Sequence, residues 1–330
     1  MRRPMPDVTF VQAITQALAH EMAADERVVV LGEDVAASGG VFRATDGLLE
    51  RFGPDRVMDT PLAETVIAGL AVGLAAEGLR PVVEIQFAGF MYSALDQLLN
   101  HASRLRNRTR GRLTCPMVLR APCGGGIKPP EHHSDSPEAI LAHIPGLKVV
   151  VPSTPAQMYG LLLAAIRDPD PVVVLEPARL YRALREDVPD SGEELPIGMS
   201  FVRRNGTDLT IVTWGGMVPE ALAVADELSA EGVEATVIDV ASINPLDMDP
   251  ILASVAQTGR CVIVHEAARQ SGFGAEIAAR LADEGLASLA APVTRATGYD
   301  TIFPLARLEA KYIPDRRRML AAARRVLEYA

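Results

Sequence analysis

Short, continuously apolar segments recur along this chain, and they constrain its fold more than any other feature. Val28–Leu31 and Val172–Leu175 contain only Val and Leu. A strand that is apolar at every position suits a parallel sheet covered on both faces. Helical patterns stand between such segments, as in Pro155–Arg167. The alternation predicts an α/β fold with doubly wound, parallel sheets.

Composition and breaker residues give the expected boundaries of these elements. Strands are expected at Val28–Gly32, Val82–Phe87, Met117–Ala121, Lys148–Val151, Val172–Leu175, Leu209–Thr213, Ala235–Asp239, Cys261–His265 and Pro292–Ala296. Helices are expected at Thr9–Ala24, Leu62–Glu77, Ala94–Arg106, Pro155–Arg167, Pro219–Glu231, Pro250–Gln257, Ala275–Glu284 and Arg316–Glu328.

A polar segment divides the chain near its middle. Residues 185–200 are rich in Pro, Gly, Asp and Glu and have little periodicity, as is typical of an interdomain linker. The chain of 330 residues is long enough for two domains. We therefore expect a first domain at 1–185, a linker at 186–202 and a second domain at 203–330.

Charge and composition exclude several classes of function. The net charge of −10 argues against nucleic acid and anionic membranes as partners, and it suits a basic protein partner. The longest apolar run, Thr65–Ala76, is too short to span a bilayer. Met1–Asp7 contains no apolar core of a signal peptide. The three cysteines lack disulfide or metal spacing, so a cytoplasmic location is expected.

Glu64 is the only charged residue between Pro61 and Ala76. Thr60 and Pro61 resemble an N-cap and a first helical residue, which would place Glu64 in the first turn. A helix that is apolar all round is buried, and a carboxylate on it must be paired, hydrogen-bonded or protonated. Enzymes use such carboxyls to transfer protons, although a first-turn acid can also simply stabilise the helix dipole.

Gly69 and Gly73 lie on one face of the same predicted helix. Glycines at this spacing allow another backbone to approach closely. The spacing fits either tight packing within the chain or a contact with another subunit.

Phe90 and Tyr92 follow a predicted strand that ends near Gly89. Ligands of open α/β sheets bind beyond the carboxyl ends of the strands. The two rings are therefore candidates for stacking on a flat ligand, and core packing is the alternative.

A long loop runs from Gly124 to Glu138 and contains His133. Ser136 and Pro137 resemble the start of a helix, whose dipole would keep a preceding histidine neutral and able to exchange a proton. His132 and His133 lack a third metal ligand at standard spacing. The three glycines that begin the loop do not complete a phosphate-binding motif.

Two further turns carry polar groups. The Ala165–Asp170 turn has two acids and free carbonyls, which suit either a hard cation or a solvated turn. Gly272–Gly274 follows His265 and precedes a helix, which suits an anion site or a close-packed turn.

Taken in order, these segments resemble the β subunit of the thiamine diphosphate-dependent E1 component of 2-oxo acid dehydrogenase complexes. The resemblance covers nearly the whole chain. The motifs are Val30–Val35, Asp59–Glu64, Gly78–Pro81, Glu84–Phe87, Asp96-Gln97, Arg120–Pro122, His133–Ala139, Pro145–Pro155, Ile166–Asp168, Leu175–Pro177, Val264–Ala267 and Phe273–Glu276.

This resemblance implies a pyrimidine-binding domain followed by a transketolase C-terminal-type domain, in an α2β2 heterotetramer. It implies that Glu64 contacts N1′ of the cofactor's aminopyrimidine, that Phe90 stacks on that ring and that Leu62 lines the pocket. The activated cofactor would attack the 2-oxo acid, CO2 would leave, and the acyl group would pass to lipoyl-lysine on E2. His133 would assist substrate binding and reductive acylation.

The resemblance also implies a structural K+ near the Asp168 turn. Its ligands would be backbone carbonyls near four residues, together with two acids: Cys115, Met117, Val118, Ala165, Asp168 and Asp170. The chain lacks the Gly-Asp-Gly and Asn signature that binds Mg2+ and diphosphate in this family. An E1 α subunit should therefore hold Mg2+ and complete the cofactor site.

Substrate preference is predicted from two segments. His132–Asp135 and Pro304–Glu309 look more like branched-chain forms than pyruvate forms, so a branched-chain 2-oxo acid is expected and pyruvate or acetoin dehydrogenase is the alternative. Asp135 stands where many members have Gln, and Ala310-Lys311 reverses the commoner order. An assembly subunit that docks E2 without catalysis is a second alternative. The acidic charge would suit a basic binding domain of E2.

Overall fold

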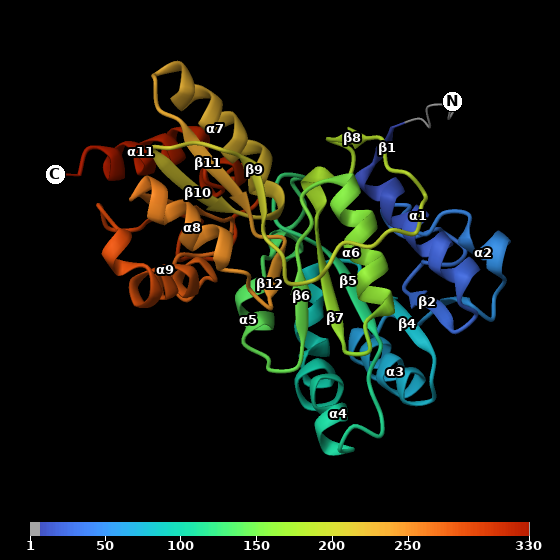
Figure 1. The fold of residues 1–330 in the computed structure, drawn as a ribbon. Helices are drawn as coiled ribbons and strands as arrows, with labels where there is room; N and C mark the ends of the chain where they lie inside the picture. Colours follow the sequence, from blue (N-terminus) through green and yellow to red (C-terminus); the bar gives the residue numbers. More distant parts are fainter. Residues whose placement is uncertain (1–6, 330) are drawn as a thin grey trace. The chain divides into compact units, whose positions relative to one another are not determined.

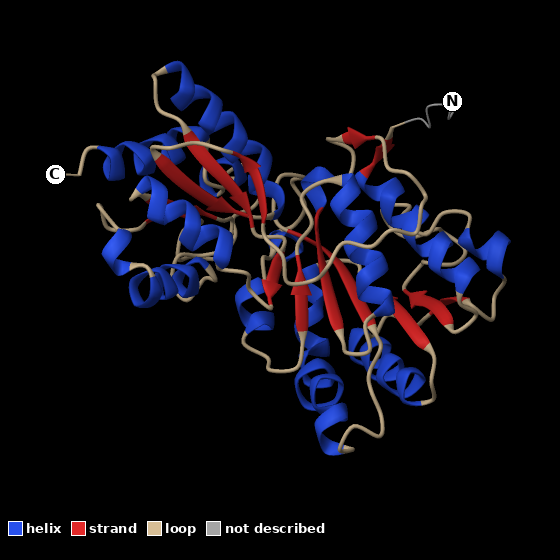
Figure 2. Ribbon diagram, in the orientation of Figure 1, coloured by secondary structure: helices blue, strands red, loops and turns tan. Residues whose placement is uncertain are grey.

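The computed structural model describes residues 7–329, which form two compact units, each with its own sheet (Figures 1 and 2). The first unit comprises the described residues up to Cys123 together with Ile140–Ile197. The second comprises Gly124–Ala139 and the described residues from Gly198 onward. Most of Met1–Asp7, where no signal peptide is predicted, lies outside the described residues.

The first unit is built on parallel strands in the order β6-β7-β5-β4-β2-β3. Their bounds are β2 Val28–Gly32, β3 Val57–Asp59, β4 Arg80–Glu84, β5 Val118–Cys123, β6 Lys148–Val150 and β7 Val172–Pro177. Every residue of β2, β5 and β7 is buried, as is typical of parallel strands covered on both faces.

Helices complete this unit. They are α1 Phe10–Ala24, α2 Leu48–Phe52, α3 Glu64–Ala76, α4 Leu105–Arg108 and α6 Pro155–Arg167. Helices α1 and α6 pack against each other, and α3 packs beside β4. A two-stranded antiparallel pair joins β1 Val8–Thr9 to β8 Arg185–Glu186.

The second unit has a five-stranded sheet in the order β14-β13-β10-β11-β9. The strands are β9 Phe201–Arg204, β10 Leu209–Thr213, β11 Ala235–Asp239, β13 Cys261–Val264 and β14 Thr294–Ala296, and only β9 pairs in the antiparallel sense. The helices are α7 Val218–Ala230, α8 Asp249–Thr258, α9 Gly274–Glu284, α10 Glu309–Tyr312 and α11 Arg316–Leu327. Strand β12 is Ser242–Asn244, and α5 is Glu138–Ala142.

The structure confirms the predicted α/β class and most of the predicted elements. Helix α6 and strands β2, β10 and β11 have the predicted bounds. Thr9 caps α1 through a capping box with Gln12, so that helix begins one residue later than predicted.

One predicted helix, Ala94–Arg106, is wrong as a continuous α-helix. The chain instead forms a 3-10 helix at Ala88–Ala94, a π-helix at Gln97–His101 and a second 3-10 helix at Ala102–Arg104. Side chains compete for backbone carbonyls here, because both Ser103 Oγ and Arg104 Nε donate to Leu99 O.

None of the helices within residues 7–329 combines the length and the apolar character needed to cross a membrane.

Candidate functional site

Helix α3 places Glu64 at its first position. The predicted start at Thr60 and Pro61 is wrong, because the N-cap is Ala63 and the helix begins at Glu64. The Thr60 amide donates instead to Gly32 O at 2.9 Å, which ties the approach to α3 to the end of β2. Glu64 nevertheless lies in the first turn, as predicted, and its side chain is half-buried.

The predicted burial of this helix on every face is also wrong. Leu62, Val66 and Leu70 are 81%, 57% and 45% exposed. Val66 and Leu70 are four apart and share one face of α3, and Leu62 lies just before the helix. We call these three exposed side chains the apolar stripe. Helix α3 buries Ile67 and Ala71 on its other side. It therefore has apolar side chains on both its buried and its exposed face.

Ser93 connects Glu64 with the aromatic segment that follows β4. Its hydroxyl donates to Phe90 O at 3.0 Å, and it lies 3.5 Å from Glu64 Oε2. Thr65 Oγ1 donates to Ser93 O at 2.6 Å, which fixes the segment against α3. The structure thus brings together Glu64 and Phe90, two of the predicted site residues. No sequence pattern predicts a role for Ser93, because a lone serine after an aromatic residue is not distinctive.

Glu33 is a second carboxyl in this region that sequence reasoning missed. It follows β2, is 6% exposed, and its Oε1 atom has no hydrogen-bond partner among the described residues. Burial raises the pKa of Glu33, and the charges of Glu64 and Asp34 raise it further. A carboxyl whose pKa is raised by burial and by a neighbouring carboxylate is typical of sites that hold or move a proton.

Phe90 belongs to a series of aromatic contacts. Its ring meets Phe87 edge-on at 6.0 Å between centroids, Phe87 meets Phe42 at 5.5 Å, and Phe42 meets Tyr181 at 5.0 Å. These contacts orient the half-buried Phe90 ring, and Leu62 remains almost fully exposed.

A buried ionic network lies within the sheet of the first unit. Arg120 on β5 donates to both carboxylate oxygens of Glu176, at 2.7 and 2.9 Å, and also to Glu84. Tyr181 donates to Glu176 at 2.5 Å. Because every member is buried and satisfied, the network holds neighbouring strands β4, β5 and β7 in register.

The glycine loop, residues 124–135, groups with the second unit and is held there by two carboxylates. The Gly125 amide donates to Glu266 Oε2 at 2.8 Å, and the Gly126 amide donates to Glu309 Oε1 at 2.6 Å. Both acids are buried, at 9% and 3% exposure. These amides therefore bind carboxylates of the chain itself.

The loop tolerates no side chain at its centre. A Cβ atom on Gly125 would lie 2.6 Å from the Phe303 ring and 2.8 Å from Ile313 Cδ1. The packing fixes the path of the loop that carries His133.

His133 lies in a short 3-10 helix, Glu131–Ser134. Its pKa is lowered, chiefly by burial and then by the neighbouring His132, while Glu131 opposes the shift. A neutral His133 at pH 7 agrees with the sequence-based expectation, but burial is the main cause. Helix α5 begins at Glu138, one residue after the predicted start.

Glu138, which follows the glycine loop, contacts Trp214 of the second unit. Trp214 Nε1 donates to Glu138 Oε1 at 3.2 Å, and the indole stacks on His265 at 5.2 Å between ring centroids. Burial raises the pKa of Glu138 to about 7, and the charge of Glu266 adds to this. Gly272 and Gly274 pack directly on the His265 ring, which supports the close-packed turn over an anion site.

Ion pairs occupy the acids of the predicted K+ site. Lys148 Nζ lies 2.5 Å from Asp168 Oδ2, and Arg106 Nε lies 2.7 Å from Asp170 Oδ1. Arg80 donates to the carbonyls of Ile166 and Asp168, at 2.7 and 3.3 Å. The four residues whose carbonyls are predicted to bind K+ are all buried. Cys115 and Met117 precede β5, Val118 begins β5, and Ala165 lies in α6. Residues 7–329 contain no cluster of three His, Cys, Asp or Glu suited to a metal.

Comparisons with known proteins match nearly the whole chain to the same family. Residues 7–183 match the family model of the transketolase pyrimidine-binding domain, and residues 198–319 match that of the transketolase C-terminal domain. A pyruvate dehydrogenase E1 component subunit beta of Bacillus subtilis is 50% identical over 98% of this chain and 100% of its own length. A 3-methyl-2-oxobutanoate dehydrogenase subunit beta of Mycobacterium tuberculosis is 53% identical over 97% of this chain and 92% of its own.

A solved structure has the same fold. It is described as a split gene transketolase, inactive beta4 tetramer, and it superposes with a TM-score of 0.81 and 26% sequence identity, over 98% of this chain and 99% of the other.

Proposed function

Because this chain belongs to the β subunits of the E1 components of 2-oxo acid dehydrogenase complexes, we propose that it joins an E1 α subunit to decarboxylate a branched-chain 2-oxo acid. The observation that carries the proposal is the half-buried Glu64, placed beside Ser93 and Glu33 at the edge of an uncovered apolar stripe. Such an edge suits a cofactor pocket that a second subunit completes.

The described residues fit one half of a thiamine diphosphate site. Glu33 Oε1 is buried without a partner and lies in the field of Glu64, so the region has unused hydrogen-bonding capacity. Bound thiamine diphosphate would supply the carbon nucleophile that adds to the 2-oxo acid, and its ring would take up the electron pair left behind when CO2 departs. Mg2+ would be held mainly by the α subunit.

Each residue has a distinct task in this proposal. Glu64 would hydrogen-bond N1′ of the aminopyrimidine and exchange a proton there. Phe90 would stack on the ring, held in place by Phe87, and Leu62 would line the pocket. His133, neutral at pH 7, would accept or donate a proton during substrate binding and during acyl transfer to lipoyl-E2.

The preference for a branched-chain substrate rests on sequence and on one contact. The Mycobacterium tuberculosis relative is 53% identical and the Bacillus subtilis relative 50%. Glu309, in the segment that resembles branched-chain forms, binds the glycine loop that carries His133. Pyruvate is the second candidate, because relatives named for pyruvate are similar over their full length.

Two further roles are proposed. The net charge of −10 suits docking of a basic domain of E2 by the second unit. A structural K+ near the Asp168 turn would be held by carbonyls rather than by the two acids, which already form ion pairs.

The experiment compares the chain alone, its α partner alone and the co-expressed pair, each supplied with thiamine diphosphate and Mg2+. Turnover of 3-methyl-2-oxobutanoate and pyruvate is measured with an artificial electron acceptor. We expect activity only from the pair, with a higher kcat/KM for 3-methyl-2-oxobutanoate. Activity of the chain alone would refute the shared site, and an equal or higher kcat/KM for pyruvate would refute the branched-chain preference.

A further inference from the structure

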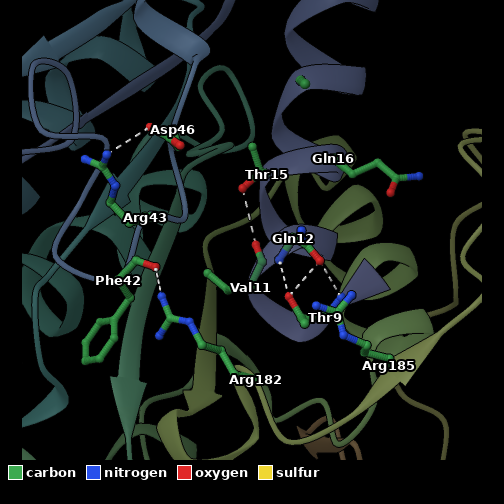
Figure 3. A pocket seen from close by; sticks show the side chains of 11 residues that line it. Thr9, Val11, Gln12, Thr15, Gln16, Phe42, Arg43, Asp46, Arg182 and Arg185 are labelled. Carbon is green, nitrogen blue, oxygen red and sulfur yellow. Dashed lines mark hydrogen bonds and ion pairs between the residues drawn. The ribbon is translucent and has the colours of Figure 1, made fainter. Parts of the chain in front are cut away.

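A cavity of about 550 Å3 lies in the first unit, away from the residues assigned to the cofactor (Figure 3). The start of α1 forms one wall, the segment before α2 forms a second, and the segment between β7 and β8 forms the third. The volume is in the range of small-molecule sites. None of the residues that line the cavity has a role in the proposed reaction.

Positive charge is concentrated around this cavity. Arg43, Arg182 and Arg185 line it, and Asp46 is the only acid among the lining residues. Arg43 lies 3.7 Å from Asp46, so that pair is partly neutralised. Within residues 7–329, no carboxylate lies within ion-pair distance of Arg182 or Arg185. A local excess of positive charge is unusual in a chain with a net charge of −10.

The walls of the cavity are fixed without a ligand. Thr15 Oγ1 donates to Ala44 O at 2.8 Å, which joins α1 to the segment before α2. Arg182 donates to Phe42 O at 3.3 Å, and Arg185 donates to Asp7 O at 3.0 Å. Figure 3 shows that Thr15, Arg182 and Arg185 come from separate segments of the chain. Preformed walls lower the entropic cost of binding.

The charged and apolar groups indicate the kind of ligand. Guanidinium groups bind carboxylates and phosphates through paired hydrogen bonds. The N-terminal amide of α1 at Gln12 is already capped by Thr9, so recognition would rest on the arginines. The Phe42 ring, packed against Tyr181 and Phe87, adds an apolar surface for a carbon skeleton.

We propose that this cavity binds a small oxyanion with more than one negative charge, either an organic phosphate or a polycarboxylate. Arg182 and Arg185 both line the cavity, so a multivalent anion bound there would be attracted by more than one guanidinium group. The cavity contains none of the residues assigned to the cofactor, although its Phe42 ring packs on Phe87, which in turn packs on Phe90.

The test uses the co-expressed α/β pair saturated with thiamine diphosphate and Mg2+, so that the cofactor site is filled. Citrate represents polycarboxylates and fructose 1,6-bisphosphate represents organic phosphates, and binding is measured by isothermal titration calorimetry. We expect saturable binding of at least one probe. The variant Arg182→Ala/Arg185→Ala should bind at least about tenfold more weakly. The control Arg203→Ala/Arg317→Ala removes the same charge from exposed positions of the second unit and should change affinity less than about twofold.

A gain of affinity distinguishes the site from general loss of structure. Asp46→Asn removes the carboxylate that competes for Arg43, so affinity for the bound probe should increase severalfold. The proposal is overturned if neither probe binds, if the double variant binds as well as the parent, or if only a polyglutamate peptide binds. The last outcome would assign the cavity to an acidic protein partner.

Discussion

The edge of the first unit around Glu64 and the glycine loop of the second unit both place carboxyl groups beside proposed reacting residues, but their surroundings are opposite. Glu64 is half-buried and has one long contact, 3.5 Å from Ser93. Glu266 and Glu309 are buried, and each accepts a backbone amide hydrogen bond at 2.8 or 2.6 Å.

This difference distinguishes a carboxyl proposed to react, Glu64, from carboxylates that stabilise the glycine loop, Glu266 and Glu309. Glu266 and Glu309 each accept a backbone amide of the glycine loop, although Glu309 Oε2 has no hydrogen-bond partner among the described residues. Glu64 accepts no backbone amide in this way, and the apolar stripe beside it is exposed. The loop is therefore anchored by acids of the chain itself, whereas the edge presents apolar side chains that a group from outside the chain would cover.

The strongest test of this contrast is Glu64→Gln in the α/β pair. Loss of a proton-exchanging carboxyl should lower decarboxylation about 10²- to 10⁴-fold. The melting temperature should hardly change, because Gln can still accept the Ser93 hydrogen bond. Glu77→Gln, at the exposed C-cap of the same helix, is the matched control and should retain activity. Retained activity in Glu64→Gln would favour the assembly-subunit alternative.

Glu138 gives the second largest expected effect, through pH. Its pKa is about 7 in the folded chain, against an ordinary value of 4.5. The folded state therefore binds the proton more tightly, and the stability from neutral Glu138 is present below pH 4.5 and is lost as pH rises through 7. The difference corresponds to about 3 kcal/mol.

Urea unfolding of the parent and of Glu138→Gln at pH 5 and pH 8 measures this effect. Glutamine keeps an acceptor for Trp214 and does not titrate, so the parent should lose more stability than the variant between the two pH values. Equal pH dependence of the two proteins would show that Glu138 is not a buried neutral acid.

Glu309→Ala should have an intermediate effect on stability. It removes the acceptor of the Gly126 amide. Because Gly126 is exposed, water can replace the carboxylate, and the loss of stability should be about 0.5–1.5 kcal/mol. Glu309→Gln preserves an acceptor and should lose less. Denaturant unfolding measures both, and limited proteolysis should show faster cleavage within the glycine loop of the alanine variant. If both variants equal the parent, Glu309 does not hold the loop.

The smallest effect is expected from Gly73→Ala on α3. A Cβ atom there would meet nothing within 4 Å, so the variant should stabilise the chain alone by up to about 1 kcal/mol. Gly73 extends the face of the apolar stripe, so assembly with the α subunit should weaken if that face is an interface. Analytical ultracentrifugation of the pair measures assembly, and unchanged assembly would place the interface elsewhere.

Local signals made much of the fold predictable. The apolar runs of β2, β10 and β11 and the Thr154 cap of α6 are contiguous in sequence, and their elements have the predicted bounds. Strand β9 was missed because it is an edge strand with two arginines and little burial. The π-helix at Gln97–His101 depends on side-chain competition that periodicity does not show.

The site was predictable only in part. The position of Glu64 in a first turn follows from the sequence, but the exposure of Leu62 and Val66 does not, because apolar composition alone does not tell a core helix from an interface helix. The bond from Gly126 to Glu309 joins residues 183 positions apart. No local pattern marks such a contact.

The apolar stripe has a consequence for the cell that makes this chain. A newly synthesised subunit that waits for its partner presents Leu62, Val66 and Leu70 to every other exposed apolar surface. An excess of this chain over its partner would therefore be prone to aggregate and would depend on chaperones or proteases for its removal. Balanced synthesis of the two subunits would be a requirement of solubility as much as of activity.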